Sequence, residues 1–221
     1  MAATLYGKMM KPLIRVCVLL ACAVSGCSQA SSGDDDVIAA SKLYQGGKYR
    51  EAAQRFEQAL SKSLRSHTKA NVLTMIGNCY NELDEYDQAL DYHERSIQAD
   101  PSNHKAYVNK GVVHRLRGEL ELAAKCYQKA IALDPNYAEA HASLGALAIF
   151  QDDPQRAIQH LERATALDPS LAVSHSNLAV AYAAAGRFDE ADQSLKKAVL
   201  LGYDKADVIK ERIESLRRVS E

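Results

Sequence analysis

Apolar residues recur at three- and four-residue spacing along most of the chain, which is typical of amphipathic helices. In the segment 70–103, one run contains Val72, Ile76 and Cys79, and a second run begins at Tyr86 after a short polar break. Each run has the length of one helix, so the segment predicts two helices joined by a turn. Neither helix can bury its apolar face alone, so neighbouring elements must cover both faces.

The pattern of this segment recurs with a step of 34 residues. Three positions within the repeat show this step. They are occupied by the prolines Pro101, Pro135 and Pro169, by the small residues Gly77, Gly111, Gly145 and Ala179, and by the alanines Ala89, Ala123, Ala157 and Ala191. An earlier copy has Ala52 in the place of Ala89, 37 residues before it, so its link is three residues longer. A fixed period of this length indicates a solenoid of stacked hairpins, which we place at residues 37–203.

Several positions have predicted packing roles. The small residues let the two helices of a hairpin approach closely, and large side chains such as Tyr80 and Tyr127 are expected to fill the space beside them. Ala148 and Leu161 predict smaller packing groups in the fourth copy. Each Asp-Pro pair is expected at the junction between one hairpin and the next, with Asp as a helix cap and Pro in the first helical turn.

The chain ends in one more amphipathic segment, which we place at residues 204–221 as a polar end cap. The residues expected to face the last hairpin are Val208, Ile209, Ile213 and Leu216.

The repeated units resemble tetratricopeptide repeats (TPRs), which carry small residues and aromatics in fixed phases and end in Pro. In the segment 70–103 these phases are met by Gly77, Tyr80, Tyr86, Ala89 and Pro101. The resemblance implies an all-α, right-handed α-solenoid of about five helix-turn-helix repeats with a C-terminal capping helix. It also implies a concave groove, lined by the first helix of each repeat, that binds a peptide or protein and performs no reaction.

Residues of the first helices that point away from the second helices are the candidates for this groove. They are Asn78, Asn81, Lys105, Asn109, Val112, Arg115, Ala142, Ile149, Phe150, Asn177 and Val180. Asn78 and Asn109 can each donate and accept hydrogen bonds, which suits a clamp on a peptide backbone. Thr74, Glu139 and Ser143 stand where related grooves that hold acidic chaperone tails have basic residues, which argues against a carboxylate clamp. The alternative, that the candidates are solvated helix faces, stays open.

The N-terminal residues predict an export signal. Lys8, Lys11 and Arg15 precede an apolar run at 16–24 that is too short to span a bilayer. The sequence Val24-Ser25-Gly26-Cys27 resembles the lipobox of bacterial lipoproteins. The resemblance implies a signal peptide at 1–26, lipidation of Cys27 and a lipid anchor in the cell envelope. An ordinary secretory signal with a chance cysteine is the alternative.

Two further expectations follow from the same segment. Ser28 after the cysteine favours, by resemblance, the periplasmic face of the outer membrane. The polar stretch at 27–36 is expected to be a flexible tether, because it has little to bury.

The net charge and the absence of known motifs in the sequence limit the classes of function that we expect. The formal charge is −1 for the 221 residues and −4 without residues 1–26, so nucleic acid is not expected as a partner. Cys79 and Cys126 lack metal-ligand spacing and are expected to be free buried thiols. His141 and His175 share one phase and are expected to pack. With no catalytic or phosphate-binding motif, we expect no enzyme, no cofactor and no metal.

The leading hypothesis is therefore a non-enzymatic adaptor in the bacterial envelope that binds a peptide or protein segment. The alternatives are a pilotin-like assembly factor for the secretin of a type IV pilus or secretion system, and a self-associating structural lipoprotein.

Overall fold

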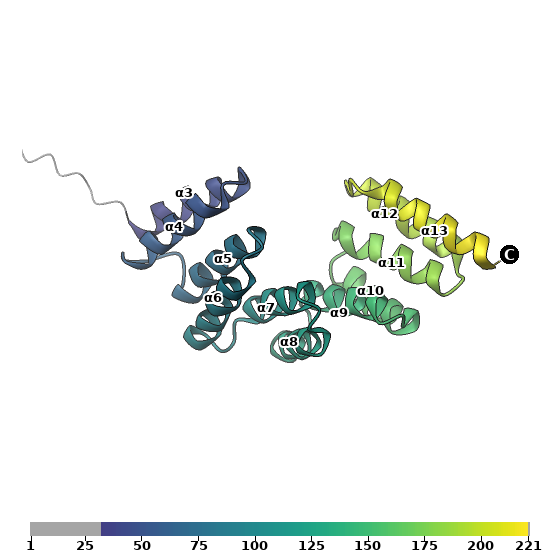
Figure 1. Cartoon of the computed structure of the whole chain (residues 1–221), viewed down its shortest axis with the longest axis horizontal. Coiled ribbons are helices and arrows are strands. Elements are labelled where there is room, and N and C mark those ends of the chain that lie inside the picture. The colour runs from purple at the N-terminus through teal and green to yellow at the C-terminus, as the bar shows by residue number, and fades with distance from the viewer. Residues whose placement is uncertain (1–31, 221) are drawn as a thin grey trace, which may run out of the picture. The chain divides into compact units, whose positions relative to one another are not determined.

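The computed structural model describes residues 32–220, and every regular element in that range is an α-helix (Figure 1). Ten of these helices form five consecutive hairpins and the eleventh ends the array. The helices are α3 (Gly33–Gln45), α4 (Tyr49–Leu60), α5 (Lys69–Glu82), α6 (Tyr86–Ala99), α7 (His104–Leu116), α8 (Leu120–Leu133), α9 (Ala138–Phe150), α10 (Pro154–Leu167), α11 (Ala172–Ala184), α12 (Phe188–Leu200) and α13 (Ala206–Ser220). The predicted signal peptide and Cys27 lie outside the described residues.

Each helix packs against the next one along the chain, and the first helices α5, α7, α9 and α11 also contact one another in sequence. The buried apolar residues form clusters that extend from one hairpin into the next. One cluster joins Phe56 of α4 to Val72 and Ile76 of α5, and another joins Tyr127 of α8 to Leu144 of α9. This distribution is expected of a repeat array, in which each hairpin buries its faces against its neighbours. The predicted all-α repeat fold is confirmed.

The small residues of the first helices lie against large side chains of the second helices. A methyl group added to Gly111 would be 2.5 Å from Tyr127 Cε1, and one added to Gly145 would overlap Leu161. Leu161 and Ala148 are both buried, so the fourth hairpin does pack with smaller groups. The residue against Gly77 is His93 and not Tyr80, which stacks on Tyr92 instead.

The role predicted for the Asp-Pro pairs is wrong in detail. Asp100, Asp134 and Asp168 are the C-terminal caps of α6, α8 and α10 and have extended backbone angles. The backbone before a proline disfavours the helical region, so each helix ends there. The Asp100 carboxylate accepts bonds from the N–H and hydroxyl of Ser102, at 2.9 and 2.6 Å, which closes a turn. The next helix is capped by another residue, Asn103 in the case of α7.

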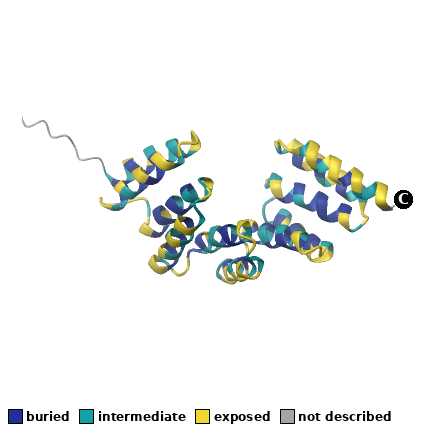
Figure 2. Cartoon of the chain, in the orientation of Figure 1, coloured by how far each residue is buried: buried dark blue, intermediate teal, exposed yellow. Residues whose placement is uncertain are grey.

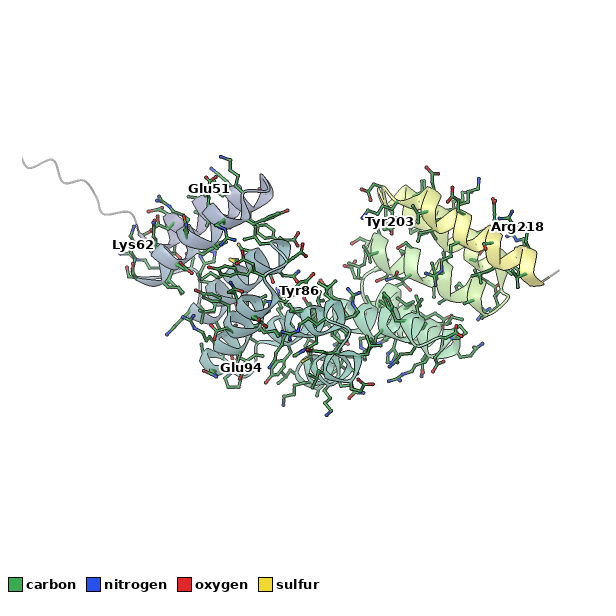
Figure 3. The ribbon with its side chains drawn as sticks, viewed as in Figure 1. Glu51, Lys62, Tyr86, Glu94, Tyr203 and Arg218 are labelled. Carbon is green, nitrogen blue, oxygen red and sulfur yellow. The ribbon has the colours of Figure 1, made fainter. Side chains whose placement is uncertain are left out.

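The first helix begins earlier than predicted, so residues 33–36 are helical and do not belong to a tether. The cause is Asp36, whose carboxylate is fully buried and lies 3.0 Å from Arg55 Nε and 2.6 Å from Lys62 Nζ. Lys62 lies two residues beyond the end of α4 (Figure 3). The Asp34 carboxylate accepts bonds from the backbone N–H groups of Arg65 and Ser66. The longer link between the first two hairpins therefore wraps the start of α3.

The last helix, α13, packs against α11 and α12 and leaves its outer face exposed (Figure 2). Ile213 is 1% exposed, and Ile209 and Leu216 contact the same apolar cluster, as predicted. Val208 is 63% exposed, so its predicted packing is wrong. It directly precedes Ile209, and adjacent residues on a helix point about 100° apart, so both cannot face the hairpin.

Candidate functional site

A groove with a volume of about 480 Å³ runs over the first helices α7, α9 and α11. Its floor includes one residue of a second helix, Tyr127 of α8. The lining residues are Val112, Arg115, Tyr127, Glu139, Ala142, Ser143, Ala146, Phe150, Leu171, Val173 and Asn177. Aliphatic and aromatic side chains dominate this set, which is the usual character of a surface that binds a ligand.

Two apolar side chains of the groove are unusually accessible. Phe150 is 66% exposed and Val173 is 53% exposed, whereas most large apolar residues of α9 and α11 are buried. The phase of the repeat explains Phe150, since it occupies the last position of a first helix, beyond the contact with the following hairpin. Exposed apolar groups beside a cavity mark a place where a partner can bury them.

Polar groups reach the groove at a few points. The Arg115 guanidinium lies over the Phe150 ring, with Cζ 5.6 Å from the ring centroid. The Tyr127 side chain is fully buried, and its hydroxyl interacts with the side chain of Arg115. Burial raises the pKa of that hydroxyl, and the nearby positive charge of Arg115 opposes the rise.

The groove unites only some of the residues predicted from the sequence. Val112, Arg115, Phe150, Asn177 and Ala142 line it together. Asn78 lines a second pocket at the other end of the array. The remaining candidates are not part of the lining: Asn81, Lys105, Asn109, Ile149 and Val180.

Two of these five have clear physical reasons for their position. Ile149 packs against the apolar cluster of the last hairpins, so its side chain points away from the groove. Val180 is 3% exposed, because α11 is packed between α9 on one side and α13 on the other. Lys105 is exposed, and Asn81 and Asn109 are partly buried.

Six lining residues were not among the candidates. Glu139 and Ser143 had been considered only as positions of a carboxylate clamp, and the other four were missed: Tyr127, Ala146, Leu171 and Val173. Two of them carry a signal in the sequence, because Ala146 is one repeat beyond Val112 and Val173 is two repeats beyond Lys105. Tyr127 carries none, since it belongs to a second helix, where its ring packs against Gly111.

The cysteines and histidines have structural roles. Cys79 and Cys126 are both free, and burial raises the pKa of Cys79 to about 12, which keeps it as an unreactive thiol. His141 Nε2 lies 3.1 Å from the Pro135 carbonyl oxygen, and His175 makes the matching contact with Pro169. Each ring thus ties a first helix to the turn before it. Residues 32–220 contain no group of three or more His, Cys, Asp or Glu that could hold a metal ion.

No helix among the described residues is both long and apolar enough to cross a bilayer.

Comparison with known sequences gives three matches to repeat families. One "Tetratricopeptide repeat" model matches residues 70–103, a "TPR repeat" model matches residues 111–148, and another "Tetratricopeptide repeat" model matches residues 148–209. Rhomboid protease GluP of Bacillus subtilis (strain 168) is 30% identical over 113 residues, which are 49% of this chain and 22% of GluP. Photosystem I assembly protein Ycf3 of Cuscuta gronovii is 32% identical over 73 residues, which are 33% of this chain and 44% of Ycf3. The matched region spans less than half the length of these curated relatives.

Solved structures share the fold at lower identity. TTC0263, a thermophilic TPR protein of Thermus thermophilus, has a TM-score of 0.68 at 23% identity, over 84% of this chain and 98% of that one. The APC/C hetero-tetramer Cut9-Hcn1 has a TM-score of 0.76 at 20% identity, over 86% and 37% of the two chains. YrrB, described as a TPR protein with an unusual peptide-binding site, has a TM-score of 0.53 at 24% identity, over 80% and 90%. With the hairpins and the repeat matches together, residues 70–103 and 111–209 are tetratricopeptide repeats.

Proposed function

We propose that the protein is a non-enzymatic scaffold that binds a peptide segment of a partner protein in the groove over α7, α9 and α11. The observation that carries this proposal is the pair of exposed apolar side chains, Phe150 and Val173, that line the groove together. The side chains of a bound peptide can cover this apolar pair.

The comparisons support the same class of function. The chain contains tetratricopeptide repeats, and YrrB, which shares the fold, is described as having a peptide-binding site. We therefore propose binding as the activity of these repeats.

We further propose that the scaffold works in the bacterial cell envelope, held at the periplasmic face of the outer membrane by lipid on Cys27. The support is the basic segment, the short apolar run and the Val24-Ser25-Gly26-Cys27 sequence. Palmitate labelling in cells tests the anchor. Labelling is expected in the natural chain and absent in Cys27→Ser, and labelling that persists in the variant would contradict the anchor.

Site-specific photocrosslinking in cells tests the groove. A photoreactive phenylalanine analogue replaces Phe150 in one variant, Val173 in a second, and Val208 in a matched control. Val208 is suited to this purpose because it is 63% exposed and lies on α13, away from the groove lining. We expect discrete crosslinked products from the first two variants and none of the same products from the third.

The groove assignment fails if the Val208 variant gives the same products, or if neither groove position gives any. A second change separates binding from mere proximity. Adding Arg115→Ala to the Phe150 variant removes the charge beside the crosslinker and should weaken the products while the fold is retained.

A further inference from the structure

The structure holds a second pocket at the other end of the array, between α3, α4 and α5. Its volume is about 260 Å³. Its lining contains two aromatic rings and a thioether with three polar uncharged side chains: Ser41, Tyr44, Gln45, Phe56, Met75 and Asn78. A space with these properties accepts one bulky apolar side chain and has no preference for charge.

The two pockets lie on the same face of the repeat array. Ser41 and Asn78 of the second pocket are one repeat apart, at 37 residues, and Val112 and Ala146 of the groove continue the same phase at steps of 34. Met75 is likewise in phase with Ser143 and Asn177 of the groove. Because α5, α7, α9 and α11 contact one another in order, this face is continuous from one pocket to the other.

Two asparagines belong to the first helices between the pockets. They are Asn81 of α5 and Asn109 of α7, neither of which lines the groove or the second pocket. The side-chain oxygen of Asn81 is buried and has no hydrogen-bond partner among the described residues. An asparagine amide can both donate to and accept from an extended peptide backbone.

Resting on the function proposed above, we propose that the ligand is one extended, uncharged segment of a partner protein that inserts two bulky apolar side chains, one into each pocket. Successive first helices are about 8–10 Å apart, and the pockets are separated by two to three such steps. An extended chain advances about 3.3 Å per residue. The two apolar residues of the ligand are therefore about five to nine positions apart, with polar residues between them.

The charges of the two pockets select against an acidic tail. The six residues of the second pocket are uncharged, and Arg115 in the groove is balanced by Glu139. Within the two pockets, a carboxylate-rich ligand would meet one cation, Arg115, and leave its other charges there without partners. A neutral segment loses nothing in this way.

Selection from a displayed library of random 16-residue peptides against the full chain tests the inference. We expect the selected peptides to share two bulky apolar positions at one spacing, with no enrichment of Asp or Glu. Binding of the best synthetic peptide is then measured by fluorescence anisotropy. Replacing either apolar residue with Ser should weaken binding by about tenfold or more, since each anchor buries a large apolar side chain.

Variants of the protein identify the pockets. Phe150→Ser changes the groove, and Gln45→Lys changes the rim of the second pocket at an exposed position, so both keep the fold. Asn78→Lys is a second rim variant, and Val208→Ser is the control. Each pocket variant should weaken the two-anchor peptide by about tenfold or more, and each should have no effect on a peptide that lacks the corresponding anchor.

The outcomes separate the two proposals. Peptides with a single apolar position that respond only to Phe150→Ser would overturn the two-pocket ligand and leave the groove function standing. Enrichment of acidic peptides would overturn the neutral ligand. A library with no binder, or with binders that respond to none of the pocket variants, would contradict both the ligand and the groove function.

Discussion

The imidazole of His93 lies directly against the backbone of Gly77, so that a methyl group at Gly77 would be 2.6 Å from His93 Cε1. The same contact joins Gly111 to Tyr127 and Gly145 to Leu161 in the following repeats. The side chain of the second helix thus fills the space that the missing Cβ leaves on the first helix, and this contact sets the distance between the helices of the hairpin.

We predict that Gly77→Ala destabilises the protein by about 1–3 kcal/mol, because the added methyl group forces apart helices that are already in contact. Urea unfolding measures the change. Gly46→Ala is a matched control, since a methyl group there would be 3.5 Å from the Leu43 carbonyl oxygen, an ordinary contact. Equal stability of the two variants would show that the close approach at Gly77 is not a constraint.

Acid should weaken the fold through His93. Its ring is fully buried, both ring nitrogens lack hydrogen-bond partners among the described residues, and burial, aided by the charge of Lys110, lowers its pKa from 6.5 to about 4. The unfolded chain takes up a proton on this residue below about pH 6.5, whereas the folded chain does so only below about pH 4. The stability that the neutral ring of His93 contributes is therefore complete above pH 6.5, and it is lost as the pH falls toward 4.

The expected loss is up to about 3 kcal/mol over that interval. Unfolding curves at pH 7.5, 6, 5 and 4.5 should show His93→Leu losing much less stability than the natural chain. His141→Gln serves as the control and should retain the acid loss, because His93 is still present. If His93→Leu and the natural chain have parallel pH profiles, His93 is not the group responsible.

The buried carboxylate of Asp36 is predicted to hold the first helix in place. Asp36→Asn should cost about 2–3 kcal/mol, less than a fully buried ion pair, because Arg55 and Lys62 are 43% and 35% exposed. Hydrogen exchange should show the loss of protection concentrated in α3. Asp207→Asn, an exposed acid in the first turn of α13, is the control and should leave α3 unchanged. Unaltered protection of α3 in Asp36→Asn would contradict this role.

The end of the array provides a further pair of variants. Ile213→Ala should destabilise by about 2–4 kcal/mol, since Ile213 is 1% exposed and contacts the cluster between α11 and α13. Val208→Ala, on the same helix but 63% exposed, should change stability by about 0.5 kcal/mol or less. Thermal unfolding of the two variants side by side measures the difference, and equal midpoints would mean that α13 does not seal the last hairpin.

The fold follows from the sequence because the step of 34 residues fixes which residues share a face. The spacing of Gly77, Gly111 and Gly145 is enough to predict where the helices approach closely. The phase also places Val112 and Phe150 on the side of the groove. It does not say what covers that side, and for this reason it also points to Val180 and Ile149, although one is buried and the other packs toward the core.

Features that depend on contacts between distant residues could not be read from the period. Tyr127 lines the groove although it belongs to a second helix and is fully buried, and a repeat pattern does not show which buried side chains border a groove. Asp36 belongs to a run of three acids that reads as solvated, and only Arg55 and Lys62, brought near by the turn after α4, explain its burial. The greater length of the first link was visible in the sequence. The bonds from Arg65 and Ser66 of this link to Asp34 were not.

Those contacts determine how the array responds to mechanical load. The amide of Gly33 donates to the Ser63 carbonyl oxygen at 3.1 Å, and Asp34 and Asp36 hold the same loop and the end of α4. A pull applied along the chain from its amino-terminal side reaches these bonds before any interface between hairpins. These bonds join the start of α3 to the loop after α4, so the first hairpin should resist being opened from that end.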